Sequence, residues 1–194
     1  MNYVIHLLDR KDREPSMVRE LEAFCPGEWQ VFPAIREPDG KIGISKSLRR
    51  LLQLAKEQAL PSMLVFEDDV RFCSPRAREH WELCVADLPG EWDLLLGGAY
   101  SHSGVNVGPR LKRLSSFCSL HCALFNHTAY DKVQEHRPES GPAMGMHIDV
   151  WLSGLGLKVY LCDPQIAIQY NGFSDTVKAH TNYDSLVSRM NLLP

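Results

Sequence analysis

The chain has 194 residues, of which 44% are hydrophobic, and its 21 basic and 24 acidic residues give a net charge of −3. This length accommodates one domain with a complete core and is short for two, so we expect a single domain over residues 1–194. The near-neutral charge gives no general attraction to nucleic acid or to an anionic membrane, so any phosphate has to be bound by a local group of residues.

The sequence has no recognisable targeting segment. No stretch approaches the roughly 20 consecutive apolar residues of a membrane-spanning helix, and the first residues lack the basic region and long apolar run of a secretory signal. The six cysteines are scattered, and no two of them have CxxC spacing. These features predict a cytoplasmic protein without a transmembrane segment, whose thiols are reduced and mostly buried.

The first half of the chain alternates between strand-like and helix-like segments. Apolar runs of strand length fall at residues 3–8, 29–34, 62–66 and 92–96, and helical spacing of apolar residues falls at 15–24, 44–59 and 75–85. The continuous apolar run at 62–66 is typical of a central strand that is covered on both faces. This alternation predicts an α/β fold with a mainly parallel central sheet, helices on both faces, and ligands beyond the carboxyl ends of the strands.

The second half is less regular. Residues 101–109 are rich in Ser, Gly, Asn and His, which predicts a surface loop that either closes over a ligand or has no function. We expect a strand over 117–125, helices over 128–136 and 147–155 with a flexible segment at 141–145 between them, and short extended segments at 158–161 and 165–169. From Gly172 onward the chain is polar and is predicted to be irregular.

Three carboxylates, Glu67, Asp68 and Asp69, follow the apolar run at 62–66. Like charges this close raise one another's pKa unless a cation neutralises them. Mg²⁺ and Mn²⁺ prefer oxygen ligands and usually take only one or two from the protein, leaving the rest to phosphate and water. The triplet therefore indicates the metal site of a nucleoside-diphosphate-binding protein. The alternative is a solvated turn in which one acidic residue caps the next segment.

Around this triplet the chain resembles glycosyltransferase family 25, which comprises the bacterial lipooligosaccharide-type galactosyltransferases and the collagen hydroxylysine galactosyltransferases. The stretch 64–70, Leu-Val-Phe-Glu-Asp-Asp-Val, is similar to the hydrophobic-EDDV signature of that family. Further similarities follow in the expected order and cover most of the chain: Arg13, Gly43, Ser47, and residues 92–97, 148–152 and 164–175. The chain departs from the family at His6, Ile44 and Leu48, where the family has Asn, Cys and His.

The resemblance implies a GT-A-like fold that binds a nucleotide sugar, and metal-dependent transfer of a hexose with inversion. The donor would be a UDP-sugar carrying galactose or glucose, and the acceptor a hydroxyl of a surface saccharide, as in lipopolysaccharide biosynthesis. Mn²⁺ or Mg²⁺ is assigned to Asp69, with Glu67 and His180 as further ligands. The residues assigned to donor binding are Arg13, Gly43, Glu67 and Asp68. The catalytic base is assigned to Asp149, with Asp175 as second choice.

Each assignment has a structural alternative. Asp149 at the start of a helix is stabilised by the helix dipole without any catalytic role, Asp175 would cap the next segment, and His180 would be an ordinary surface histidine. The whole chain has two functional alternatives. One is a non-catalytic module that binds sugar nucleotides, and the other is a nucleotidyltransferase-type metal enzyme, for which the sequence lacks a glycine-rich phosphate loop.

The acceptor and the oligomeric state are left open by the sequence. A nucleic-acid acceptor is disfavoured by the net charge of −3, but a local basic patch keeps it open as an alternative. The residues of that patch are Arg49, Arg50, Arg110, Lys112 and Arg113.

Overall fold

The computed structural model describes residues 1–139 and 147–194, so the segment expected to be flexible, 141–145, lies outside the described residues. The helices are α1 (Glu14–Phe24), α2 (Gly40–Glu57), α3 (Ala77–Ala86), α4 (His127–Gln134), α5 (Ile148–Ser153) and α6 (Asp184–Val187). The main sheet contains β1 (Asn2–His6), β2 (Trp29–Pro33), β3 (Ser62–Glu67), β5 (Leu94–Leu96), β6 (His102–Asn106), β7 (Leu111–Phe117), β8 (Cys122–Asn126) and β9 (Val159–Cys162). Two small ribbons pair β4 (Val70–Phe72) with β10 (Ala167–Gln169) and β11 (Gly172–Ser174) with β12 (Ala179–Thr181).

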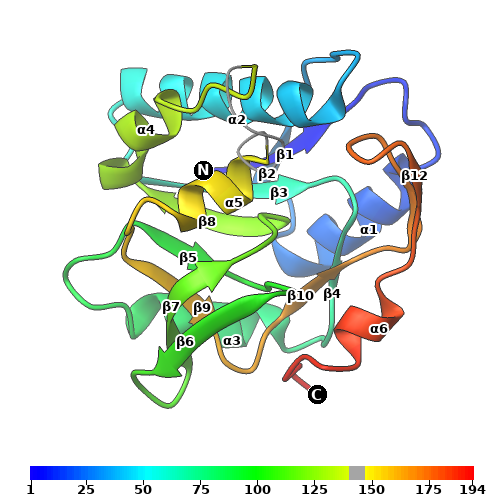
Figure 1. Ribbon diagram of the computed structural model, residues 1–194. Coiled ribbons are helices and arrows are strands. Elements are labelled where there is room, and N and C mark those ends of the chain that lie inside the picture. The colour runs from blue at the N-terminus through cyan, green and yellow to red at the C-terminus, as the bar shows by residue number, and fades with distance from the viewer. Residues whose placement is uncertain (140–146) are drawn as a thin grey trace.

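The eight strands of the main sheet lie in the order β2-β1-β3-β8-β5-β9-β7-β6 (Figure 1). β1 is parallel to β2 and β3, and β5 is parallel to β9, whereas β8 and β7 are antiparallel to their neighbours. Six of the eight strands therefore point the same way, which confirms the mainly parallel sheet.

Side chains of β3 alternate between two apolar clusters, one on each face of the sheet. Met63 and Val65 pack with residues of α2, α4 and α5, whereas Leu64 and Phe66 pack with residues of α1 and α3. All four side chains are buried. Because helices cover both faces, β3 is a central strand, as its continuous apolar run predicts.

The expected helices and central strands are confirmed, with shifts at their ends. The largest shift is in α2, which begins at Gly40 instead of residue 44. The carboxylate of Asp39 accepts a hydrogen bond of 2.9 Å from the main-chain nitrogen of Lys41 and so caps the helix there. The first turn, residues 40–43, contains two glycines and a single apolar side chain, Ile42, which is why the pattern of apolar residues misses it.

Three expectations for the second half are wrong. Residues 117–125 are not one strand, because the chain leaves β7 at Phe117, passes through Ser119 at φ 93°, and returns as β8. The expected loop 101–109 contains β6, an edge strand whose backbone pairs with β7 although its side chains are mostly polar and exposed. The tail after Gly172 is ordered into β11, β12 and α6.

Two further observations concern the helices and the cysteines. None of the described helices combines the length and apolar character needed to cross a membrane. All six cysteines are free thiols, and four of them are buried.

Candidate functional site

A pocket of about 340 Å³ lies at the carboxyl ends of β1 and β3. One wall comes from the residues after β1 and β2 and from the start of α2, and the opposite wall comes from residues that follow β5 and precede α6. Of the eight site residues expected from the sequence, the pocket brings together seven: Arg13, Gly43, Glu67, Asp68, Asp69, Asp149 and Asp175. His180 is not among the residues that line it.

The carboxylates of Glu67 and Asp69 converge on a single amide group. Nε2 of Gln169 donates to Oε2 of Glu67 over 3.0 Å and to Oδ1 of Asp69 over 3.1 Å. Burial raises the pKa of Glu67 well above its usual value, and the charges of Asp69 and Asp149 raise it further. Burial also raises the pKa of Asp69, although Arg13 acts against that rise. We call Glu67 and Asp69 the acidic pair.

The acidic pair fits a hard divalent cation. It offers carboxylate oxygens, which Mg²⁺ and Mn²⁺ prefer, and a bound cation would oppose the rise in pKa that burial and the neighbouring carboxylates cause. Throughout residues 1–139 and 147–194, no three His, Cys, Asp or Glu side chains are grouped so that they could hold a metal ion. A cation at the acidic pair therefore needs most of its ligands from water or from a bound substrate.

Asp68 lines the same pocket as the acidic pair but is paired with other side chains of the protein. Its Oδ2 lies 2.7 Å from Nδ1 of the buried His6, and its Oδ1 accepts a hydrogen bond from Arg13. The same guanidinium lies 3.3 Å from Oδ2 of Asp69 and donates to the main-chain oxygen of Phe173 over 2.8 Å. Asp68 and Arg13 thus fix the loop after β3 against the loop after β1, and Arg13 supplies positive charge to the pocket.

Asp149 lies in the first turn of α5 and is held by main-chain groups and a thiol. Its Oδ2 accepts hydrogen bonds from the main-chain nitrogen of Ser119 over 2.7 Å and from the thiol of Cys118 over 3.2 Å. Its Oδ1 accepts from the main-chain nitrogen of Val150 over 2.9 Å. Asp149 and Glu67 line the same pocket, and the charge of Asp149 contributes to the raised pKa of Glu67.

Asp175 and His180 belong to the turn and second strand of the β11–β12 ribbon. Asp175 is paired with Arg10 and lies 3.8 Å from a guanidinium nitrogen of Arg36, so both of its oxygens face positive charge. His180 is exposed and packs its ring against the ring edge of Phe173, with ring centroids 5.7 Å apart. The structure does not bring His180 together with the acidic pair.

Gly43 lies where α2 passes the segment after β2. A Cβ atom at this position would lie 2.7 Å from the main-chain oxygen of Ile35, which is too close for any side chain. Ser47 stabilises the same contact, since its hydroxyl donates to the oxygen of Gly43 over 2.7 Å and accepts from the nitrogen of Ile35 over 2.8 Å. Gly43 therefore shapes the pocket wall through its lack of a side chain.

Sequence reasoning did not identify three residues that contribute to this pocket: Gln169, Tyr100 and Tyr183. Gln169 is opposite Val70 in the β4–β10 ribbon, and the main-chain nitrogen of the next residue, Tyr170, donates to the oxygen of Asp69. Tyr100 follows β5 at the same edge of the sheet, where the carboxyl-end rule for parallel strands would have pointed to it. Tyr183 lies in the polar tail, where no local signal marks it.

Comparisons with known proteins establish the fold. Neither a known protein family nor a curated protein matches the sequence. Among solved structures, a glycosyltransferase involved in the glycosylation of the major capsid of PBCV-1 is similar with a TM-score of 0.60 and 8% identity over 91% of this chain and 95% of that one. A mannose-1-phosphate geranyltransferase from Thermus thermophilus is similar with a TM-score of 0.50 and 9% identity, over 83% of this chain and 72% of that one. A197 from STIV also gives 0.50 and 9%, over 93% of both chains.

These similarities confirm the expected fold class, an α/β GT-A-like fold, and at such low identities they show the fold alone. Membership of glycosyltransferase family 25 in particular stays a prediction.

Proposed function

We propose that this chain is a metal-dependent glycosyltransferase that moves a hexose, galactose or glucose, from a UDP-sugar to a hydroxyl of a saccharide acceptor with inversion. The observation that carries the proposal is the acidic pair, Glu67 and Asp69, held by Gln169 in a pocket at the carboxyl ends of the central strands. Proteins that use divalent cations to bind diphosphates place carboxylates in this way.

The donor nucleotide is assigned to the crevice between β1 and β3. In the sheet order, β2 lies on one side of β1 and β3 on the other, so the order of the parallel strands reverses at this point, where open α/β sheets bind ligands. Arg13 and the start of the 18-residue helix α2 line the crevice and offer positive charge to phosphate groups.

Asp69 and Glu67 would hold Mn²⁺ or Mg²⁺. The bound ion would neutralise the negative charge that develops on the departing diphosphate. The protein's own contribution to the proton transfer is assigned to Asp149. Three hydrogen bonds from Ser119, Cys118 and Val150 hold its carboxylate in place, and it faces the same space as Glu67. There it can accept the proton of the acceptor hydroxyl as the new glycosidic bond forms. Asp175 is disfavoured for this role because two arginines engage it.

The test is release of nucleoside diphosphate from a panel of UDP- and GDP-sugars in the presence of Mn²⁺, with and without saccharide acceptors. Asp69→Asn should lower the release at least about 100-fold, because transition-state charge stabilisation of this kind is worth that much. The matched control is Asp131→Asn, which changes a carboxylate on α4 that is 71% exposed and lies outside the pocket. Wild-type protein that neither binds nor turns over any donor, or an Asp69→Asn variant as active as wild type, would overturn the proposal.

The acidic pair fits a second candidate function, a nucleotidyltransferase-type metal enzyme, because such enzymes also hold their metal on carboxylates at strand ends. The two reactions release different products. Incubation with nucleoside triphosphates and hexose 1-phosphates releases pyrophosphate if this candidate holds, and none if the chain is a glycosyltransferase. Donor binding with no turnover in either assay would indicate a non-catalytic sugar-nucleotide-binding module.

A further inference from the structure

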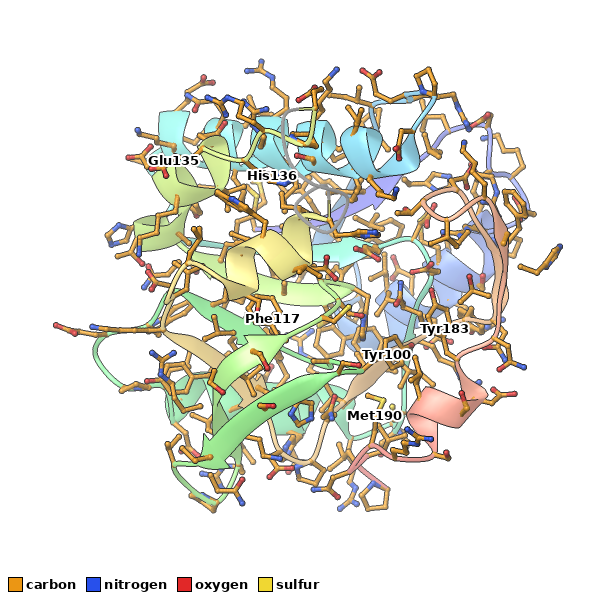
Figure 2. All side chains as sticks on the ribbon, in the orientation of Figure 1. Tyr100, Phe117, Glu135, His136, Tyr183 and Met190 are labelled. Atoms are coloured by element: carbon orange, nitrogen blue, oxygen red, sulfur yellow. The ribbon has the colours of Figure 1, made fainter. Side chains whose placement is uncertain are left out.

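The pocket wall beyond the acidic pair carries two stacked aromatic rings (Figure 2). Tyr100 follows β5 and Tyr183 precedes α6, and their rings are nearly parallel, with an interplanar angle of 6° and centroids 4.9 Å apart. Leu186 of α6 lines the pocket next to them. Segments more than eighty residues apart in the chain thus combine into one wall with aromatic and aliphatic surface, and neither tyrosine has a role in the chemistry proposed above.

The aromatic wall has a fixed position relative to the acidic pair. The hydroxyl of Tyr100 accepts a hydrogen bond of 2.6 Å from the main-chain nitrogen of Gln169, whose side chain holds Glu67 and Asp69. Tyr183 stacks on Tyr100 and lines the same pocket as Glu67 and Asp69. A molecule resting on the rings is therefore next to the reacting groups.

The sheet topology assigns this wall to the acceptor side. The nucleotide crevice lies between β1 and β3, whereas Tyr100 follows β5, which is separated from β3 by β8. Asp149, the proposed base, is held by the loop between β7 and β8, on the same side of β3. The base and the aromatic wall thus both lie beyond the acidic pair as seen from the nucleotide.

The charge of this region selects a neutral ligand. Glu67, Asp69 and Asp149 all line the pocket. The cation proposed at the acidic pair offsets this charge for the donor's diphosphate, whereas an acceptor carrying phosphates or carboxylates next to Asp149 would be repelled. A pyranose ring has an apolar face of C–H groups and a rim of neutral hydroxyls, which suits an aromatic surface next to hydrogen-bonding carboxylates.

We propose that Tyr183, backed by Tyr100, is the platform on which the pyranose ring of a neutral saccharide acceptor packs while one of its hydroxyls meets Asp149. The inference rests on the proposed glycosyltransferase function and names its acceptor class. Tyr183 acts as a specificity-determining residue through its ring, and its hydroxyl is dispensable.

The experiment compares Tyr183→Ala, which removes the ring, with the matched control Tyr183→Phe, which keeps it. Binding of methyl β-D-galactopyranoside and methyl β-D-glucopyranoside is measured by saturation-transfer NMR with UDP and Mn²⁺ present, and the KM values for donor and acceptor are measured by UDP release. We expect Tyr183→Ala to weaken glycoside binding and raise the acceptor KM at least about tenfold. The donor KM should change much less than the acceptor KM, and Tyr183→Phe should keep most of the glycoside binding that Tyr183→Ala loses.

The proposed acceptor platform would be overturned if wild type bound neither glycoside or if Tyr183→Ala left the acceptor KM unchanged. A rise in the donor KM instead would also overturn it and would assign the rings to the nucleotide base. Failure of the proposed function has a different signature, namely that wild type releases no UDP from any donor and binds none. A circular dichroism spectrum and an unfolding curve confirm that Tyr183→Ala is folded, as the partial exposure of this side chain leads us to expect.

Discussion

Nδ1 of His6 lies 2.7 Å from Oδ2 of Asp68, so a buried side-chain contact joins the carboxyl end of β1 to that of β3. These two strands flank the crevice assigned to the nucleotide. His6 is also one of the positions at which the chain departs from glycosyltransferase family 25, which has Asn there. Asparagine, like histidine, carries a nitrogen donor near the backbone, which makes His6→Asn a conservative test of this contact.

The contact between His6 and Asp68 gives the first prediction. His6→Ala should lower the free energy of unfolding by about 2 kcal/mol, because a buried hydrogen bond to a charged group is lost, whereas His6→Asn should recover part of that loss. Urea unfolding of the two variants and wild type measures both effects. Equal stability of His6→Ala and wild type would show that the contact contributes nothing.

The second prediction concerns Gly43. In Gly43→Ala the new Cβ would meet the main-chain oxygen of Ile35 at 2.7 Å. The steric cost, about 1–3 kcal/mol, should exceed the gain in helix propensity, which is at most about 1 kcal/mol. We expect a less stable protein with weaker donor binding. Gly90→Ala is the matched control, because nothing lies within 4 Å of its added Cβ, and thermal unfolding compares the two.

A third prediction tests the amide that holds the acidic pair. Gln169→Leu keeps the approximate size of the side chain but leaves Glu67 and Asp69 without their shared donor. The Mn²⁺ concentration needed for half-maximal nucleotide release should rise about 10- to 100-fold, as for other residues that orient metal ligands. Gln53→Leu on α2, whose amide donates to the exposed Glu57, should leave it unchanged. An unchanged Mn²⁺ requirement in Gln169→Leu would remove this role.

The fourth prediction concerns acid stability. His121 is fully buried, and the group that opposes the effect of this burial on its pKa is the main chain of Ala167. Burial lowers its pKa to about 4, below the ordinary value of 6.5 that applies in the unfolded chain. Between these two pH values the unfolded chain binds the extra proton, so stability falls as the pH drops through this window, by about 3 kcal/mol in total.

Urea unfolding at pH 7 and at pH 4.5 measures the acid effect, with two variants for comparison. His121→Leu should lose this part of the pH dependence, and His180→Gln, which changes an exposed histidine, should keep it. If the stability of His121→Leu depended on pH as strongly as that of wild type, the acid sensitivity would belong to other groups.

Much of the first half of the molecule follows from local patterns. The apolar run at 62–66 predicts β3 because a strand covered on both faces needs apolar side chains at every position, and that requirement is visible in the sequence. The acidic triplet directly follows this strand, so the sequence also predicts that Glu67 and Asp69 lie at its carboxyl end. The different role of Asp68 could not be predicted, because its partners His6 and Arg13 are distant from it in the sequence.

The rest depends on contacts that leave no local trace. β6 is polar because it is an edge strand, and its backbone pairing with β7 decides its conformation. The turn that separates β7 from β8 passes through Ser119 at φ 93°. Serine rarely adopts a positive φ, so the residue type does not predict this turn. Gln169 reaches the acidic pair only because β10 pairs with β4, a long-range event that no spacing rule encodes.

The distance in sequence between Gln169 and Glu67 has a consequence for how the protein is made. The two residues are 102 positions apart, yet one hydrogen bond of 3.0 Å joins them. During translation, β1, β2 and β3 leave the ribosome long before β10, so the two carboxylates of the acidic pair first face each other without the amide that holds them. The acidic pair should therefore bind a divalent cation more weakly until β10 has paired with β4 and has brought Gln169 into place.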